Sequence, residues 1–356
     1  MRRFLPWLLV TIIIIIRLIY FYQGRPSYPD GTRLRITYRV TSEPIRYSSS
    51  RYLRLRGFKV YLPLFPEVNY GDRVIIEGRV DGEILKDPSL IGIKERGGNL
   101  YYLRKRLIAF YQKSLPNDHA ALVAGMTLGS KANIGQDFWA VLKESGTAHV
   151  VVASGMNVTL IASFLTTFLV LVIPRRRAIF LAIVGIWLYA LISGFDAPIV
   201  RAAVMGSVAF TAQVLGKVYN ATRALFLSAF ALLFIKTDWL YDLGFILSFV
   251  ATLSLIIFVP KLQKVFKALP KGIRENLVTT LSAQIGVAPI LYIAFGQFNV
   301  LSPLANILVL WTVVPVTIIG MISGIISLVT VPIGTLILWL SYPLTLWFIS
   351  VVNVFG

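Results

Sequence analysis

The residues that could do chemistry lie inside an apolar stretch. Residues 144–160 read E-S-G-T-A-H-V-V-V-A-S-G-M-N-V-T-L and include His149, Ser154, Gly155 and Asn157. In hydrocarbon, polar groups need partners within the protein or water in a cavity. His149 and Ser154 could form a hydrolytic pair, but no third residue that would orient them is evident. Polar packing or pore lining is therefore the better interpretation of this stretch.

Further polar side chains interrupt the apolar segments that follow. Arg201 lies early in a predicted span, where a charge costs roughly 2.5–3.5 kcal/mol on insertion scales. Three aspartates are candidates to pair with it: Asp196, Asp238 and Asp242. Arg201 either forms such a structural pair or lines a path for anions. Gln284 and Asn306, which are surrounded by small residues, complete a predicted polar interior.

Composition limits the chemistry that is available to the chain. Its 356 residues are 56% hydrophobic, and the mean hydropathy is +0.74. There is no cysteine, which excludes disulfides and thiolate sites, and the two histidines, His119 and His149, cannot form a His-rich zinc site. We predict neither a metal nor another cofactor. Apolar runs of about 20 residues recur, so the fold class is a polytopic α-helical membrane protein.

Membrane helices must position the polar residues. Residues 1–22 are predicted to form an N-terminal membrane helix, since no small-x-small cleavage site follows Tyr22. Eight further spans are predicted, for a total of about nine: 147–173, 178–195, 197–215, 221–236, 239–259, 278–295, 303–328 and 334–352. Lysines and arginines gather in alternate loops, which predicts a cytoplasmic N-terminus with residues 23–146 and the C-terminus outside.

Two amphipathic segments are predicted to lie along membrane surfaces. Residues 101–146 read as amphipathic helices at the outer surface. Residues 261–274 carry four lysines and one arginine at spacings that suit one face of a short helix. We interpret this run as a positive-inside anchor, with docking of a cytoplasmic partner or an anionic lipid as the alternative.

Residues 23–100 have the period-2 pattern of β-strands with one buried face. Apolar and basic residues alternate in Thr32–Val40 and again in Ser50–Leu62, where Gly57 allows a turn. Gly71–Val80 is predicted to be a third strand. Several short strands with glycine-marked bends favour a small, OB-like β-barrel.

Basic side chains repeatedly occupy the face of these strands that points away from the core. Together with one tyrosine they form a predicted polyanion-binding set: Arg33, Arg35, Arg39, Arg54, Arg56, Lys59 and Tyr61. An Arg-rich face can simply be solvated. The preference for arginine over lysine and the neighbouring tyrosine nevertheless favour phosphate contact and base stacking. The net charge of +19 agrees with a polyanionic partner.

Five sequence blocks between residues 122 and 306 can be compared with a known family. They read L-V-A-G-M-T-L-G-S-K, G-T-A-H-V-V-V-A-S-G-M-N-V, A-L-I-S-G-F-D-A-P-I-V-R-A-A-V-M, L-Y-D-L-G-F-I-L-S-F-V-A-T-L-S-L and A-Q-I-G-V-A-P-I-L-Y-I-A-F-G-Q-F-N-V-L-S-P-L-A-N. In this order they resemble the competence domain of the ComEC DNA-uptake channel family. The preceding G-D-R-V-I-I-E-G-R-V resembles that family's OB-like domain. The matching channel positions are His149, Ser154, Gly155, Arg201, Gln284 and Asn306.

The resemblance implies a bacterial inner-membrane channel that admits single-stranded DNA to the cytoplasm during natural transformation. Its implied partners, besides the lipid bilayer, are an extracytoplasmic DNA receptor and a cytoplasmic ATP-driven DNA translocase. Residues 23–100 would be the OB-like domain, 101–146 the surface helices and 147–356 the channel domain.

The sequence departs from the family pattern in two places. Asn157 stands where the family commonly has a second histidine, which weakens any proton-relay role there. Many members continue into a metallo-β-lactamase-like nuclease domain, whereas this chain has no H-x-H-x-D-H cluster. We therefore expect no enzyme activity from these residues. The chain would be either part of a longer protein or a naturally short member.

Two other functions remain as alternatives. A secondary transporter for a small anionic substrate would show inverted repeats between the halves of the bundle. An intramembrane serine hydrolase would depend on Ser154 and His149, and it would be indifferent to the arginines of residues 23–100.

Overall fold

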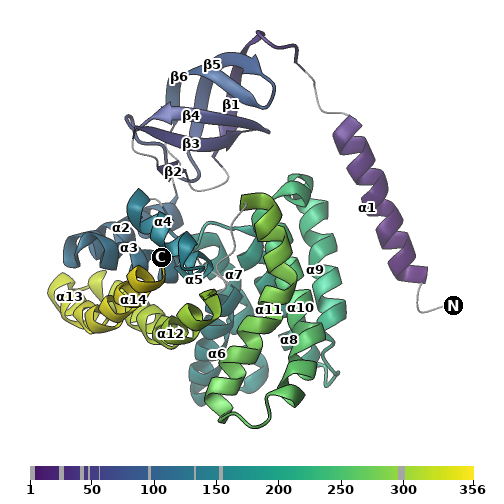
Figure 1. Ribbon diagram of the computed structural model, residues 1–356, viewed down its shortest axis with the longest axis vertical. Coiled ribbons are helices and arrows are strands. Elements are labelled where there is room, and N and C mark those ends of the chain that lie inside the picture. The colour runs from purple at the N-terminus through teal and green to yellow at the C-terminus, as the bar shows by residue number, and fades with distance from the viewer. Residues whose placement is uncertain are drawn as a thin grey trace. The chain divides into compact units, whose positions relative to one another are not determined.

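The structure is a computed structural model. It describes residues 5–23, 28–40, 44–46, 49–55, 57–94, 98–131, 134–151, 155–295 and 301–356. It is mostly helical and contains one sheet (Figure 1). The chain divides into two compact units, which we describe separately. The first comprises Met1–Pro26, Ser154–Ala190 and Phe195–Ile307, and the second comprises Ser27–Ala153, Leu191–Gly194 and Leu308–Gly356.

The sheet of the second unit has six strands. They are β1 (Arg33–Arg39), β2 (Ile45–Arg46), β3 (Ser50–Leu55), β4 (Phe58–Pro63), β5 (Arg73–Asp81) and β6 (Ile84–Lys94). Their order is β1-β5-β6-β4-β3-β2, and every pair is antiparallel except β4 with β6. The sheet is therefore mixed, with β1 and the two-residue β2 as its edges.

One hydrophobic core lies against the concave side of this sheet. Ile36 of β1 and Leu53 of β3 belong to the same buried cluster, although three strands separate β1 from β3 in the sheet order. The sheet must therefore curl around its core. Among the described residues no ladder joins β1 to β2 or β3, so this is an open mixed sheet, and the predicted closed barrel is not seen.

The period-2 prediction is confirmed for four strands. The buried apolar residues of β1, β3, β4 and β5 follow the predicted alternation, and Gly57 turns the chain between β3 and β4 with a φ of 96°. Arg51 of β3 is an exception, because it is buried and donates to the Leu64 carbonyl at 3.0 Å. The prediction missed β6, which is the longest strand. Pro88 and Gly92 lie inside β6, and its ladder with β5 shifts register twice. These interruptions hide the alternation from a sequence pattern.

The other part of the second unit is helical. It contains α2 (Asn99–Ser114), α3 (Asn117–Leu128), α4 (Gln136–Glu144), α5 (Ala148–Val151), α13 (Val331–Trp339), α14 (Tyr342–Phe355) and the part of α12 (Ser302–Ser327) that begins at Leu308. Helix α3 packs against α2, α5 and α14, and every residue from His119 to Leu128 is buried. The prediction that residues 101–146 form surface helices is thus wrong for α3. That helix is apolar on all sides and is buried for that reason.

Glycines of α12 let α2 and α3 approach closely. A Cβ atom at Gly320 would lie 2.5 Å from Cγ2 of Thr127, and one at Gly324 would lie 2.7 Å from the hydroxyl of Tyr111. The Tyr111 hydroxyl donates a hydrogen bond of 2.8 Å to the Gly320 carbonyl. The G-x-x-x-G spacing therefore makes a groove in α12 that the Tyr111 ring fills.

His119 joins α3 to α14. Its Nδ1 lies 2.7 Å from the Thr345 hydroxyl, and its ring stacks on Tyr342 at a centroid distance of 4.4 Å. Burial lowers the pKa of His119, and the neighbouring Asp118 offsets part of this effect. The folded state therefore favours the neutral ring.

Acidification is expected to loosen this contact. An unfolded histidine takes up a proton near pH 6.5. The contribution of the neutral His119 ring to the free energy of unfolding is therefore complete above about pH 6.5. It is lost as the pH falls through the lower pKa that His119 has in the folded state. When the pH is lowered from 7.5 to 5.5, the thermal midpoint of the purified chain should fall by a larger amount than the midpoint of the His119→Gln variant. Equal pH dependence of the unmodified chain and of His119→Gln would refute the assignment.

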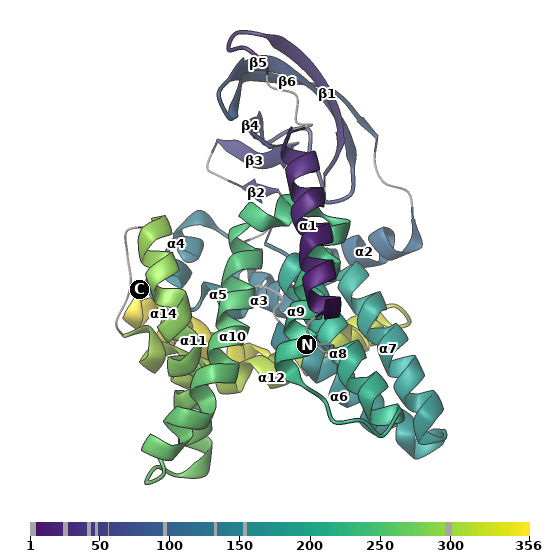
Figure 2. The same ribbon diagram turned by 90° about the vertical axis from the view of Figure 1, so that its right-hand side faces the viewer.

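The first unit is a helical bundle. Its helices are α1 (Leu5–Gln23), α6 (Gly155–Val172), α7 (Arg175–Ile192, up to Ala190), α8 (Ala197–Val214), α9 (Ala221–Ile235), the short η1 (Thr237–Tyr241), α10 (Leu243–Val265), α11 (Lys271–Phe295) and the start of α12. Helix α8 packs against α6, α9 and α10, and α10 and α11 run side by side (Figures 1 and 2). Helix α8 therefore holds a central place in this unit.

Judged by length and composition, five helices in the described part of the chain can cross a membrane. They are Ala148–Val172, Ala197–Val214, Leu243–Val265, Arg274–Ile293 and Ser302–Ser327, and α13 with α14, bent by 45°, could form a sixth. The chain is thus a multi-pass membrane protein. Helix α7 begins with three arginines and α9 has only 15 residues, so neither meets the same criteria. The count of about nine spans stays a prediction.

Candidate functional site

Two rows of cations cross the exposed face of β1, β5 and β6. In the first row Arg39 of β1 lies opposite Arg73 of β5, which lies opposite Lys94 of β6. The second row has the same composition: Arg33, Arg79 and Lys86. All six side chains are exposed. Since a strand rises by about 3.3 Å per residue, the six steps along the strand from Arg33 to Arg39 separate the rows by roughly 20 Å.

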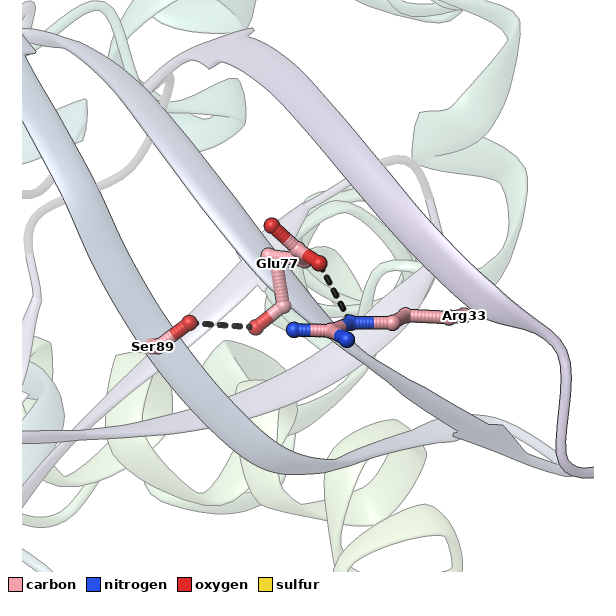
Figure 3. Close-up of polar contacts among 3 residues, drawn as sticks. All are labelled: Arg33, Glu77 and Ser89. Carbon is pink, nitrogen blue, oxygen red and sulfur yellow. Dashed lines mark hydrogen bonds and ion pairs between the residues drawn. The ribbon is translucent and has the colours of Figure 1, made fainter.

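On β5, one carboxylate stands between the two rows. Glu77 of β5 lies opposite Arg35 of β1 and Ser89 of β6. Its carboxylate forms an ion pair with Arg33, and the Ser89 hydroxyl donates 3.3 Å to its main-chain carbonyl (Figure 3). Lys86 pairs with Asp81 at 2.6 Å, which raises the pKa of Lys86. Among the described residues, no carboxylate forms an ion pair with Arg35, Arg39, Arg73, Arg79 or Lys94.

The structure separates the predicted polyanion-binding set into two groups. Arg33, Arg35 and Arg39 lie on β1, beside the cations of β5 and β6. The others lie on β3 and β4, where Arg54 is opposite Lys59 and Tyr61 is opposite Tyr52 at a ring distance of 5.4 Å. Arg56 lies outside the described residues. The β3–β4 group thus combines two cations with two aromatic rings.

Sequence reasoning missed four cations of the rows: Arg73, Arg79, Lys86 and Lys94. The sequence pattern could have identified the two arginines on β5, because Arg73 and Arg79 alternate with the buried Val74, Ile76 and Val80. The two on β6 belong to the strand that the pattern did not reveal. The pairing of β5 with both β1 and β6 also could not be read from alternation alone.

In the first unit, Arg201 lies where α6, α8 and α10 meet. Its guanidinium donates to the Thr252 hydroxyl of α10, and it lies 6.0 Å from the centre of the Phe249 ring. A Cβ atom at Gly155 of α6 would lie 2.9 Å from Nη2 of Arg201, so only glycine fits without displacing the guanidinium. Gly155 and Arg201 therefore lie close together, and their role in a polar interior stays a prediction.

The aspartates that the sequence offered as partners of Arg201 lie elsewhere. Asp196, Asp238 and Asp242 all act on the charge of Lys236, and Asp242 also accepts the Phe245 N–H at 2.9 Å as the cap of α10. Among the described residues, no carboxylate lies within ion-pair distance of Arg201. The structural ion pair is therefore not formed.

The remaining predicted channel residues that the structure describes lie on several elements. Asn157 is fully buried in α6, and Gln284 of α11 donates to the Ser302 hydroxyl at 2.5 Å. Asn306 is buried in α12 and its Oδ1 has no hydrogen-bond partner. His149 lies exposed on α5 in the second unit. Ser154 lies outside the described residues, so its predicted pairing with His149 is not tested.

Comparison with known proteins agrees with the sequence blocks. The competence protein family matches residues 126–356, which is more than half of the chain. ComE operon protein 3 of Bacillus subtilis (strain 168) is 28% identical over 207 residues, which cover 58% of this chain and 26% of the relative. An uncharacterized protein of Aquifex aeolicus (strain VF5) is 26% identical over 231 residues, 64% of this chain and 52% of that protein. No solved structure matches.

The chain therefore belongs to the competence protein (ComEC) family. Membership implies a role in DNA uptake during transformation. The matched region spans about a quarter of the Bacillus relative and about half of the Aquifex one.

Proposed function

We propose that this chain forms a membrane channel through which single-stranded DNA reaches the bacterial cytoplasm. The observation that carries the proposal is the pair of cation rows on β1, β5 and β6. Like charges directly opposite each other destabilise a sheet. In both rows three neighbouring strands place a cation in the same position. In the second row Arg33 and Lys86 already have carboxylate partners, whereas no cation of the row Arg39–Arg73–Lys94 has one among the described residues. A polyanion that binds across the rows would reduce the repulsion in the unpaired row, and DNA is the polyanion that the family role supplies.

The β3–β4 group supports a single-stranded substrate in particular. Tyr52 and Tyr61 lie beside Arg54 and Lys59 on neighbouring strand positions. Stacking of a base on an aromatic ring contributes about 1–3 kcal/mol, and bases are free to stack only when they are unpaired. The curled sheet would then act as an OB-like module that holds the phosphate chain on one part of its face and bases on another.

The positions of the partners follow from the proposed topology. With the N-terminus in the cytoplasm, the sheet lies outside and would receive the strand from an extracytoplasmic DNA receptor. The exposed Lys264 in the last turn of α10 and Lys267 between α10 and α11 would then face the cytoplasm, where an ATP-driven DNA translocase could pull the strand. We assign degradation of the other DNA strand to residues outside this chain.

Binding of DNA to the purified full chain in detergent tests the proposal. A labelled 20-nucleotide oligo(dT) should bind more tightly than a duplex of equal length. The logarithm of its affinity should fall with the logarithm of salt concentration at a slope of about −3 to −4, as expected for five or six phosphate contacts. Absence of binding at 50 mM salt, or a slope near zero, would refute a DNA-binding sheet.

A further inference from the structure

Among the described residues, Arg201 has no carboxylate as a counter-ion. It contacts the Thr252 hydroxyl, the Phe249 ring and the sulfur of Met205 at 3.8 Å from Nη1, and the Tyr219 phenol also acts on its charge. Its Nε is buried and has no hydrogen-bond partner among the described residues. A charge in a membrane helix is costly unless it is paired or hydrated. The surroundings of Arg201 therefore leave its charge to be balanced by something else.

A comparison with Arg104 shows how this protein satisfies an arginine with a purely structural role. Arg104 of α2 is 6% exposed, and its guanidinium donates to the Leu128 and Ile192 carbonyls at 2.5 and 2.6 Å. These carbonyls end α3 and α7, where a cation is favourable. Arg201 has no such carbonyl acceptors in the described residues, and the nearby aspartates surround Lys236 instead. A structural role alone does not account for its position.

The Arg201 side chain is not fully enclosed by its neighbours. Arg201 is only partly buried, and so are Thr252 and Ser248 on the neighbouring face of α10. The Thr252 hydroxyl donates its proton to the Ser248 carbonyl at 2.9 Å. Its oxygen therefore accepts a hydrogen bond from Arg201 while its own proton also has an acceptor. Gly155 keeps the α6 backbone close to the guanidinium and adds no side chain that would cover it.

We infer that Arg201, with Thr252 beside it, is an anion-binding site that takes a phosphodiester group of the passing strand. A guanidinium presents its donors in a planar fork that matches two phosphate oxygens. A phosphodiester carries a single negative charge, which would balance the positive charge of Arg201. This inference rests on the proposed function for the identity of the anion, but not for the existence of the site.

Cysteine labelling can test the site directly because the natural chain contains no cysteine. Thr252→Cys places one thiol beside the guanidinium, and Ser248→Cys, one turn away, leaves the Arg201–Thr252 bond intact. Each thiol is treated with methanethiosulfonate reagents that carry either a sulfonate or a trimethylammonium group. The ratio of the two rates cancels changes in the reactivity of the thiol itself. We expect the ratio of the sulfonate rate to the trimethylammonium rate to be about tenfold higher for the protein thiol than for free cysteine, because the neighbouring guanidinium charge attracts the anionic reagent.

Variants of Arg201 provide the controls. In the Thr252→Cys background, Arg201→Gln should abolish the preference and Arg201→Lys should keep most of it. Inorganic phosphate and oligo(dT) should each slow labelling when Arg201 is present. Equal rates for both reagents with and without Arg201 would overturn the inference. The inference would also be overturned if the thiols at positions 252 and 248 are both unreactive while the separate variant Thr211→Cys, at an exposed position further along α8, is labelled normally.

The outcomes also separate this inference from the proposed function. Protection by phosphate without protection by oligo(dT) would overturn the assignment of the anion to DNA. If oligo(dT) binds the chain with the expected salt dependence but the Arg201 site shows no charge preference, the inference fails and the proposed function stands. If the site prefers anions but the chain does not bind DNA, the DNA channel fails, and a transporter of small anions takes its place.

Discussion

Replacing all six row cations by glutamine should weaken binding of oligo(dT) by about a thousandfold at 50 mM salt. Each phosphate contact that is lost removes the release of a counterion, so the salt dependence should flatten by about 0.7 per contact. Neutralising only the row Arg39–Arg73–Lys94 should give about half of that change in slope. Because the side chains of this row are exposed, face like charges and form no ion pair with a described carboxylate, neutralising them should make the sheet slightly more stable.

A matched control removes equal charge from another surface. Lys105, Arg106 and Lys113 are exposed on α2, and their replacement by glutamine lowers the net charge as much as neutralising one row. If the rows bind DNA locally, this triple variant should keep nearly full affinity. Equal losses from both triple variants would mean that overall charge, and not the rows, attracts DNA.

Tyr61→Ala should weaken binding of single strands while leaving the salt dependence unchanged, since it removes stacking and no charge.

Arg104→Ala should be the most destabilising single substitution of a charged residue in the second unit. It would leave the last carbonyls of α3 and α7 without their buried donor. A hydrogen bond to a charged group contributes about 1.5–3 kcal/mol, so the loss of two should cost about 3–5 kcal/mol. The thermal midpoint in detergent, followed by tryptophan fluorescence, should fall by roughly 10 °C.

Arg106 provides the control for this prediction on the same helix. It is exposed, so Arg106→Ala removes an equal charge without breaking a buried contact, and the midpoint should stay within about 1–2 °C. Arg104→Lys should lie between the two, because an ammonium group keeps the charge but is shorter than a guanidinium. A midpoint for Arg104→Ala that equals that of Arg106→Ala would show that the two carbonyls have other donors.

These two sites differ in how far the sequence could predict them. Alternation identifies the exposed face of each strand, so the basic character of the sheet was predictable from residues such as Arg33 and Arg39. The rows were not, because their register joins strands that are far apart in sequence, and the bulges in β6 shift it. Position along a strand is local information, whereas the partner across a ladder is not.

The helices give the same lesson in another form. Arg104, Leu107 and Tyr111 are spaced at three and four residues and share the buried face of α2, while Lys105 and Arg106 point to solvent. Helical periodicity could therefore have placed Arg104 inside, and only its acceptors on α3 and α7 required the tertiary structure. Likewise, the uniformly apolar character of α3 already indicated burial. The absence of a carboxylate beside Arg201 could not be foreseen, since three aspartates were available nearby in the sequence.

The position of α3 has a consequence for biogenesis. The buried His119 of α3 contacts Thr345 of α14, 226 residues further along the chain, and almost the whole first unit is synthesised between them. Contacts of such separation form slowly and late. At roughly 5–20 residues per second, α3 waits on the order of ten seconds or more before its packing partner leaves the ribosome. During that time the largely apolar α3 must be shielded by lipid, by an insertase or by a chaperone until α14 packs against it.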